Sequence, residues 1–175
     1  MRKKNILVTV ILLITGFGFT ATAQKPLQRT VSLGGSATCL PALTIANTDD
    51  MNFGKIQSGS TLGTVILTPA GTRTRTEGVT LPAIAGTVSD ASFSVTGNPY
   101  STYAITLPTT NFILSDGYGH SMIVNAFKST PSGTGALNSC GAQTLTVGAT
   151  LNVAAGQVGG VYENKTGFNV TIIYN

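Results

Sequence analysis

Tryptophan is absent from this 175-residue chain, histidine occurs once, and only six residues are acidic. Catalytic and metal sites are built largely from histidine, cysteine and carboxylate side chains, so few such sites are open to this sequence. The single histidine, His120, precedes Ser121 in the stretch GHSMI, which lacks the last glycine of a G-x-S-x-G nucleophile elbow. Neighbouring residues point to opposite faces of a strand, so His120 is badly placed to act as the base for Ser121. We therefore expect no enzymatic activity and no cofactor or metal.

Charge of either sign is scarce, since charged residues make up 9% of the chain. Three of the ten basic residues are Arg2, Lys3 and Lys4, and without them the formal net charge falls from +4 to +1. Nucleic-acid binding needs clustered lysine and arginine, and no such cluster occurs in the remainder. We expect no nucleic-acid partner.

The few carboxylates and arginines that attract attention have ordinary interpretations. Asp49, Asp50 and Asp116 lack the twelve-residue pattern of a calcium loop, and Asx turns are the favoured interpretation. Arg73 and Arg75 lie two residues apart on an expected strand. We favour a solvated face that discourages edge pairing over a contact with an acidic partner.

The N-terminus has the three parts of a secretory signal peptide. The basic residues are followed by an apolar run at 6–14 and by the A-x-A sequence Ala21, Thr22 and Ala23. Even counted from 6 to 19 the apolar run has 14 residues, short of the roughly 20 needed to cross a bilayer. We predict cleavage between Ala23 and Gln24, export to the periplasm, cell surface or medium, and no transmembrane segment afterwards.

Two cysteines, Cys39 and Cys140, remain in an exported chain. An oxidising compartment favours a disulfide between them, with two free thiols as the alternative. Closing a loop of about 100 residues stabilises a fold by roughly 4–5 kcal/mol in the chain-entropy model.

From residue 30 onward, short alternating runs are separated by glycine- and proline-rich turns. In the last run, Phe168, Val170, Ile172 and Tyr174 recur with period two, as in a half-buried strand. We expect strands at 30–33, 40–46, 51–56, 63–68, 73–81, 91–96, 102–107, 111–114, 121–129, 143–153 and 161–174.

Strands at this spacing, with one polar face each, predict an all-β antiparallel two-sheet β-sandwich, with an antiparallel barrel as the lesser alternative. Residues 37–175 form one domain in this interpretation, and residues 24–36 form an N-terminal extension or a first strand. The sequence leaves open whether the terminal strand completes its own sandwich or borders a groove that a neighbour fills.

Several stretches, among them NFGKI, GTVILTPAGTRT, FSVTG and VGATLNV, occur in an order and spacing that resembles the bacterial family called domain of unknown function 4402. The resemblance covers roughly residues 37–175. It implies an exported immunoglobulin-like or pilin-like β-sandwich of Gram-negative bacteria, with no established enzyme activity.

More loosely, the chain resembles chaperone–usher pilins and the spore coat U group, which end on an alternating strand with a penultimate tyrosine, here Tyr174. In such pilins a groove beside this strand is filled first by a periplasmic chaperone and then by the N-terminal extension of the next subunit. The resemblance implies a donor face that contains Leu27, Val31 and Leu33, with Arg29 on the same face, and an acceptor strand that contains Phe168, Val170, Ile172 and Tyr174.

The expected function is therefore a non-enzymatic, exported structural or surface subunit that assembles by strand donation with copies of itself or related subunits. The alternative is a monomeric periplasmic or cell-surface module that binds a glycan or a protein through loops at one end of the sandwich. Tyr100, Tyr103 and Tyr118 near turns offer a weak signal for sugar stacking, because tryptophan is absent.

Overall fold

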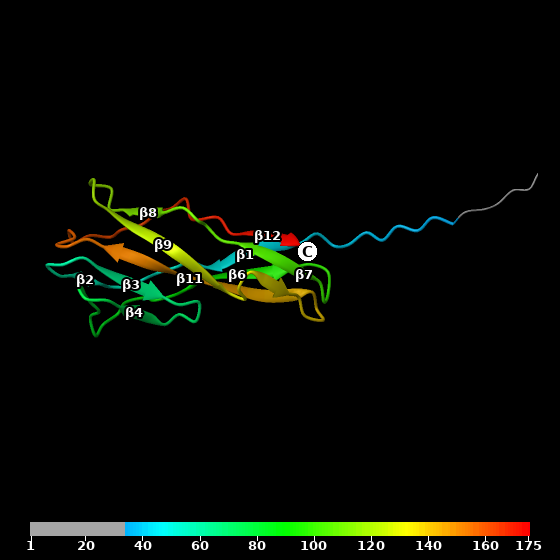
Figure 1. Ribbon diagram of the computed structural model, residues 1–175, viewed down its shortest axis with the longest axis horizontal. Coiled ribbons are helices and arrows are strands. Elements are labelled where there is room, and N and C mark those ends of the chain that lie inside the picture. Colours follow the sequence, from blue (N-terminus) through cyan, green and yellow to red (C-terminus); the bar gives the residue numbers. More distant parts are fainter. Residues whose placement is uncertain (1–33) are drawn as a thin grey trace, which may run out of the picture. The chain divides into compact units, whose positions relative to one another are not determined.

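All regular elements in residues 34–175, the part of the chain that the computed structural model describes, are β-strands (Figure 1). The predictions for the signal peptide, for Ala23 and Gln24 and for Leu27, Val31 and Leu33 lie outside these described residues. No helix in residues 34–175 is long and apolar enough to cross a membrane. The strands are β1 (Thr44–Asp49), β2 (Gln57–Ser58), β3 (Gly63–Leu67), β4 (Arg73–Arg75), β5 (Val79–Thr80), β6 (Ala91–Thr96), β7 (Thr102–Thr106), β8 (Phe112–Ser115), β9 (Ser121–Thr130), β10 (Thr134–Ala136), β11 (Ala142–Val153) and β12 (Thr171–Tyr174).

Every strand pair in this part of the chain is antiparallel, which confirms the predicted all-β antiparallel class. The largest sheet has seven strands, in which the order β1-β6-β11-β3-β4 is extended by β9 on β11 and by β8 on β9. A second sheet has the order β10-β7-β12, and β2 pairs with β5 alone. This pairing establishes antiparallel sheets with a curled large sheet. An immunoglobulin-like two-sheet sandwich stays a prediction.

The long strand β11 organises the large sheet. Its first half, 142–147, pairs with β6, and its second half, 149–153, pairs with β3 on the same edge, while β9 pairs along the opposite edge. Gly148 lies at the junction, where a Cβ atom would fall 2.6 Å from the Thr68 carbonyl carbon and 2.7 Å from the Pro69 nitrogen. Only glycine fits there, because the β3–β4 turn passes against its backbone.

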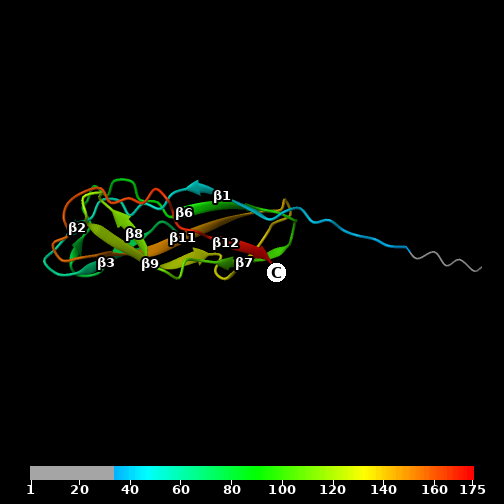
Figure 2. The ribbon, with the colours of Figure 1, turned by 90° about the horizontal axis from the view of Figure 1, so that it is seen from above.

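The apolar residues form two clusters. One lies against β3, β8, β9 and the second half of β11 and contains Val65, Leu67, Val124 and Leu151, each at most 2% exposed. The other joins β6 and the first half of β11 to β7, and contains Val95, Tyr103, Leu145 and Val147. Figure 2 shows β7 and β12 on the opposite side of β11 from β6 and β1. The second cluster packs between these two groups of strands.

Some predicted strands are shorter than expected. The expected strand at 51–56 is a loop with one isolated bridge, Asn52 to Ser89, and the expected strand at 161–174 is reduced to β12. The expected strand at 73–81 is broken between β4 and β5 by Gly78, which has a φ of 85°. Alternating polarity marks burial of one face but not hydrogen-bonded pairing, so it overestimates strand length in loops that cover a core.

The predicted disulfide is not shown by the structure and stays a prediction. Cys39 and Cys140 are both free and exposed. Thr44 of β1 and Ala142 of β11 both oppose Thr96 of the intervening strand β6, so β1 and β11 run in the same direction. Cys39 and Cys140 precede these two strands and therefore lie at the same end of the sheet, on opposite sides of β6.

Candidate functional site

The terminal strand β12 completes the core of its own domain. Ile172 and Tyr174 are half-buried against the second cluster, whereas Ile173 on the other face is 64% exposed. The Tyr174 hydroxyl accepts a hydrogen bond from the Asn98 amide at 2.7 Å and donates one to the Pro41 carbonyl at 3.1 Å. The end of β12 is therefore fixed to the β6–β7 turn and to the segment before β1.

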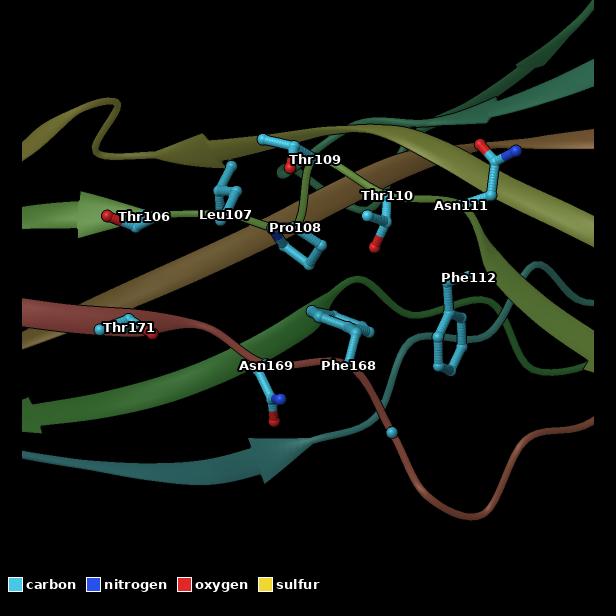
Figure 3. Close-up of a pocket in the computed structure, with 11 residues that line it drawn as sticks. Thr106, Leu107, Pro108, Thr109, Thr110, Asn111, Phe112, Phe168, Asn169 and Thr171 are labelled. Atoms are coloured by element: carbon cyan, nitrogen blue, oxygen red, sulfur yellow. The ribbon is translucent and has the colours of Figure 1, made fainter.

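Upstream of β12 the chain keeps the alternation but loses the pairing. Phe168 and Val170 are half-buried and Asn169 is exposed, yet the ladder with β7 stops at the pair Thr171 and Thr106. Beyond this pair, segments 107–112 and 167–170 diverge around a pocket of about 400 Å³. Thr110 and Phe168 point into this pocket from opposite sides (Figure 3). Segment 167–170 thus leads into β12 but forms no backbone ladder with the segment that follows β7.

Phe168 is the centre of an aromatic cluster. Its ring lies 4.9 Å from the Phe127 ring, 5.8 Å from the Phe112 ring and 6.4 Å from the Phe93 ring, measured between centroids. These contacts join β6, β8 and β9 to the segment before β12. The ring is therefore held by contacts with three other rings.

On its other side, segment 157–168 borders a groove of about 1250 Å³, above the roughly 300–1,000 Å³ of typical small-molecule pockets. Residues 50–58 form the opposite wall. The floor consists of side chains from the inner face of the large sheet and from β8, namely Ala91, Phe93, Phe112, Leu114, Met122, Val124 and Leu151. Side chains of four strands thus line one groove, which we call the β1–β12 groove. Phe93, Phe112 and Leu114 are half-buried there, whereas the other four floor residues are at most 7% exposed.

The wall at 50–58 is held firmly from outside the groove. Asn52 exchanges two backbone hydrogen bonds with Ser89, and the Lys55 amide donates to the Ala85 carbonyl at 2.6 Å. Arg73 donates from Nη1 to the carbonyls of Phe53 and Lys55, at 2.6 and 2.9 Å. Arg73 is therefore half-buried and serves the wall, which corrects the expectation of a solvated strand face, while Arg75 is exposed.

The wall at 157–168 is held by side chains and by a backbone bridge, in which Ser115 of β8 and Glu163 exchange two hydrogen bonds of 3.0 Å. Gln157 donates to the Tyr162 hydroxyl at 2.8 Å, and this hydroxyl donates to the Val158 carbonyl at 2.7 Å. Asn164 donates to the Ile113 carbonyl at 2.8 Å, which ties the wall to β8. Val161, in the same wall, is 80% exposed. This wall carries an exposed apolar side chain at the rim of an apolar groove.

Four charged residues line the groove: Asp50, Lys55, Glu163 and Lys165. Glu163 and Lys165 form an exposed ion pair of 3.2 Å. The Lys55 side chain lies along Gly86, on the neighbouring loop. Asp50 accepts a hydrogen bond of 2.7 Å from the neutral Asn47 amide and has no cationic partner among the described residues.

Of the four residues predicted to form an acceptor strand, only Phe168 lines the groove. Val170, Ile172 and Tyr174 pack against the second cluster instead. The groove residues that the sequence did not identify include Met51 and Phe53 on one wall and Met122 on the floor. For Met51 and Phe53 the sequence did contain a signal, the apolar alternation at 51–56. This alternation was interpreted as a paired strand, but it marks the inward face of a loop.

The single histidine stabilises a turn. His120 Nδ1 lies 2.6 Å from Asp116 Oδ2, and Asp116 Oδ1 accepts hydrogen bonds from the amides of Tyr118 and His120. Burial raises the pKa of the Asp116 carboxyl. These hydrogen bonds and the attraction of His120 lower the pKa by more than burial raises it, so it lies below the ordinary value. Asp116 thus forms the Asx turn that the sequence predicted, between β8 and β9.

Other candidate side chains are scattered. Within residues 34–175 no three histidine, cysteine or acidic side chains are grouped so as to hold a metal ion. Tyr103 is buried and donates a hydrogen bond of 2.7 Å to Gln143, whereas Tyr100 and Tyr118 are 76% and 90% exposed. Because one of the three rings is in the core, the tyrosines do not form one stacking platform.

Comparison with known proteins identifies one family. The model of the family described as "Domain of unknown function (DUF4402)" matches residues 43–174. The match begins just before β1 and ends at Tyr174, so it includes both walls of the groove. No curated protein and no solved structure matches the chain.

Proposed function

We propose, from the premise that the chain belongs to the DUF4402 family, that it is a non-enzymatic, exported structural or surface subunit. Its pilin-like β-domain accepts a strand from a neighbouring copy in the β1–β12 groove. The observation that carries this proposal is the groove itself, in which an apolar floor lies between two loop segments, 50–58 and 157–168. A groove of this kind suits an extended peptide that adds to a sheet edge and places alternate side chains in the floor.

The proposed occupant is residues 24–33 of a second copy. Leu27, Val31 and Leu33 alternate along this segment and offer the floor three apolar side chains about 7–13 Å apart. The segment precedes the part of the chain that the family model matches. A periplasmic chaperone would occupy the same groove before assembly.

The geometry of the domain favours assembly from head to tail. Pro41, bound by Tyr174, marks the end at which the chain enters the β-domain, whereas the groove begins at Asn47 and extends toward β8 and β2. Figures 1 and 2 show the C-terminus and β12 toward one end of the β-domain and β2 and β8 toward the other. An interface between different surfaces of identical copies is heterologous, and it produces chains unless it closes into a ring.

Deletion of residues 24–33 tests this function. We expect the chain 24–175 to form concentration-dependent multimers that resist mild denaturant, and the shortened chain to be a monomer with unchanged circular dichroism. A fluorescent peptide with the sequence of residues 24–33 is then expected to bind the monomer. Multimers that persist without the segment, or a monomeric chain 24–175 in the presence and absence of a chaperone, would contradict the proposal.

A monomeric binding module for a protein or glycan is the second candidate. Val158 and Val161, 48% and 80% exposed at the rim of the groove, favour it because they offer contact area to any extended ligand. This candidate predicts a stable monomer whose fold and size are unaffected by the deletion of residues 24–33. The same size measurement therefore separates the two functions.

We further propose that export oxidises Cys39 and Cys140 to a disulfide. Gly97 donates a backbone hydrogen bond to Gly141, next to Cys140, and Asn98 is linked through Tyr174 to Pro41, two residues after Cys39. These contacts place both cysteines at the end of the sheet that carries the β6–β7 turn. Thiol titration of protein from the periplasm tests this, and two reactive thiols under denaturing conditions would contradict it.

A further inference from the structure

The proposed donor segment contains one residue that an apolar groove would reject. Arg29 shares the alternating face with Leu27, Val31 and Leu33. A guanidinium that enters a groove without a partner loses its hydration, and the loss is large unless an anion replaces the water. We infer that Asp50 is the counter-charge for Arg29 of the inserted strand, and that this pair sets the register of the strand. This inference rests on the proposed strand donation.

Within residues 34–175, Asp50 is the one charged groove residue whose side chain neither forms an ion pair nor packs along a neighbouring loop. Glu163 is paired with Lys165, and Lys55 packs along Gly86. The Asp50 carboxylate accepts a hydrogen bond from the neutral side-chain amide of Asn47, which holds one oxygen, Oδ1, in place, while the Asp50 backbone carbonyl accepts one from the Ser89 hydroxyl. A carboxylate oriented in this way is ready to accept a guanidinium.

The position of Asp50 also suits an internal residue of the donor. Asp50 follows β1, in which Asn47 opposes Phe93 of β6, and the Phe93 and Phe168 rings, which both line the groove, contact each other. The groove continues from this point past Leu114 and Met122. An arginine at Asp50 therefore has apolar floor on at least one side, and with Leu27 and Val31 about 7 Å away on either side it fixes which floor positions they reach.

A charge exchange on the chain 24–175 tests the pair. We expect Arg29→Glu to weaken multimer formation about tenfold, measured as the midpoint concentration in light scattering after size-exclusion chromatography. Asp50→Lys is expected to weaken it similarly, and the double variant Arg29→Glu with Asp50→Lys to recover most of the loss. The difference is expected to shrink in high salt, because an ion pair at a groove rim is screened.

The matched controls are Lys25→Glu, which changes a charge of the donor segment four residues away, and Asp49→Lys, which changes the neighbouring acid at the end of β1. Both are expected to assemble normally. Multimers that depend on residues 24–33 but do not recover in the double variant would overturn the Arg29–Asp50 pair and leave strand donation intact. A chain 24–175 that never forms multimers would overturn strand donation itself.

Discussion

The hydroxyl of Tyr174 donates a hydrogen bond to the carbonyl of Pro41, and so joins the last strand to the segment before the first strand across 133 positions of sequence. The same oxygen accepts a bond from the Asn98 amide. A Cβ atom on Gly97 would collide with it, so the β6–β7 turn is shaped around this hydroxyl. The tyrosine therefore determines how β12 ends, and the C-terminus is not a frayed end.

Tyr174→Phe keeps the ring and removes both hydrogen bonds. The Asn98 amide and the Pro41 carbonyl lose their partner, so we expect the free energy of unfolding to fall by about 1–3 kcal/mol in urea denaturation. Tyr100→Phe is the control, because Tyr100 is 76% exposed and its hydroxyl has no partner among the described residues. Equal stability of the two variants would show that the Tyr174 hydroxyl has no structural role.

A methyl group at Gly148 is expected to destabilise the large sheet. The Cβ atom of alanine would meet backbone of the β3–β4 turn, the Thr68 carbonyl carbon and the Pro69 nitrogen among it, and backbone moves less easily than the end of a side chain. We expect Gly148→Ala to lower the free energy of unfolding by about 2–4 kcal/mol. Gly159→Ala is the control, since open space surrounds that position. A Gly148→Ala variant as stable as this control would contradict the close approach.

Composition and period-two alternation predicted the all-β class and most strands, because burial of one face leaves a direct mark on the sequence. They did not predict which apolar residues line the groove. Phe168 and Tyr174 carry the same alternation and both pack half-buried against the second cluster, yet of the two only Phe168 lines the groove. The difference comes from distant residues, such as Thr106 at the end of the β7 ladder, and local sequence contains no record of where a ladder stops.

The buried role of Arg73 was also beyond the sequence. Its two acceptors, the carbonyls of Phe53 and Lys55, are backbone atoms about twenty positions away, and any residue type supplies such atoms. Arg73 and Arg75 are therefore equivalent in an alternating pattern and different in the fold. Side-chain bonds to backbone at long range are the class of contact that residue identity predicts least.

The Asp116 turn predicts a specific dependence of stability on pH. The pKa of Asp116 in the fold lies below its ordinary value of 3.8, so the unfolded chain binds a proton at higher pH than the folded chain does. The stabilisation by the carboxylate is therefore complete above the unfolded pKa, and it is lost as the pH falls through the lower, folded pKa. We expect the difference in unfolding free energy between the wild type and Asp116→Asn to be largest near about pH 7 and to disappear near about pH 2.

Urea denaturation of both proteins across this range measures the difference. Asp49→Asn is a suitable control, because the Asp49 carboxylate accepts no hydrogen bond within the described part of the chain and a turn does not depend on it. A constant gap between wild type and Asp116→Asn at every pH would show that the shape of the side chain, and not its charge, holds the β8–β9 turn.

Arg73 gives the sharpest test of the groove wall, because Arg75 supplies a matched control on the same strand. Arg73→Ala leaves the carbonyls of Phe53 and Lys55 without their shared donor, and we expect it to lower the free energy of unfolding by about 1–3 kcal/mol. Arg75→Ala changes an exposed residue and is expected to alter stability by less than about 0.5 kcal/mol. Since the wall at 50–58 contributes Met51 and Phe53 to the groove, Arg73→Ala is also expected to weaken binding of the peptide 24–33, whereas Arg75→Ala is not. If both variants bound the peptide equally while only Arg73→Ala lost stability, the wall would support the fold without shaping the groove.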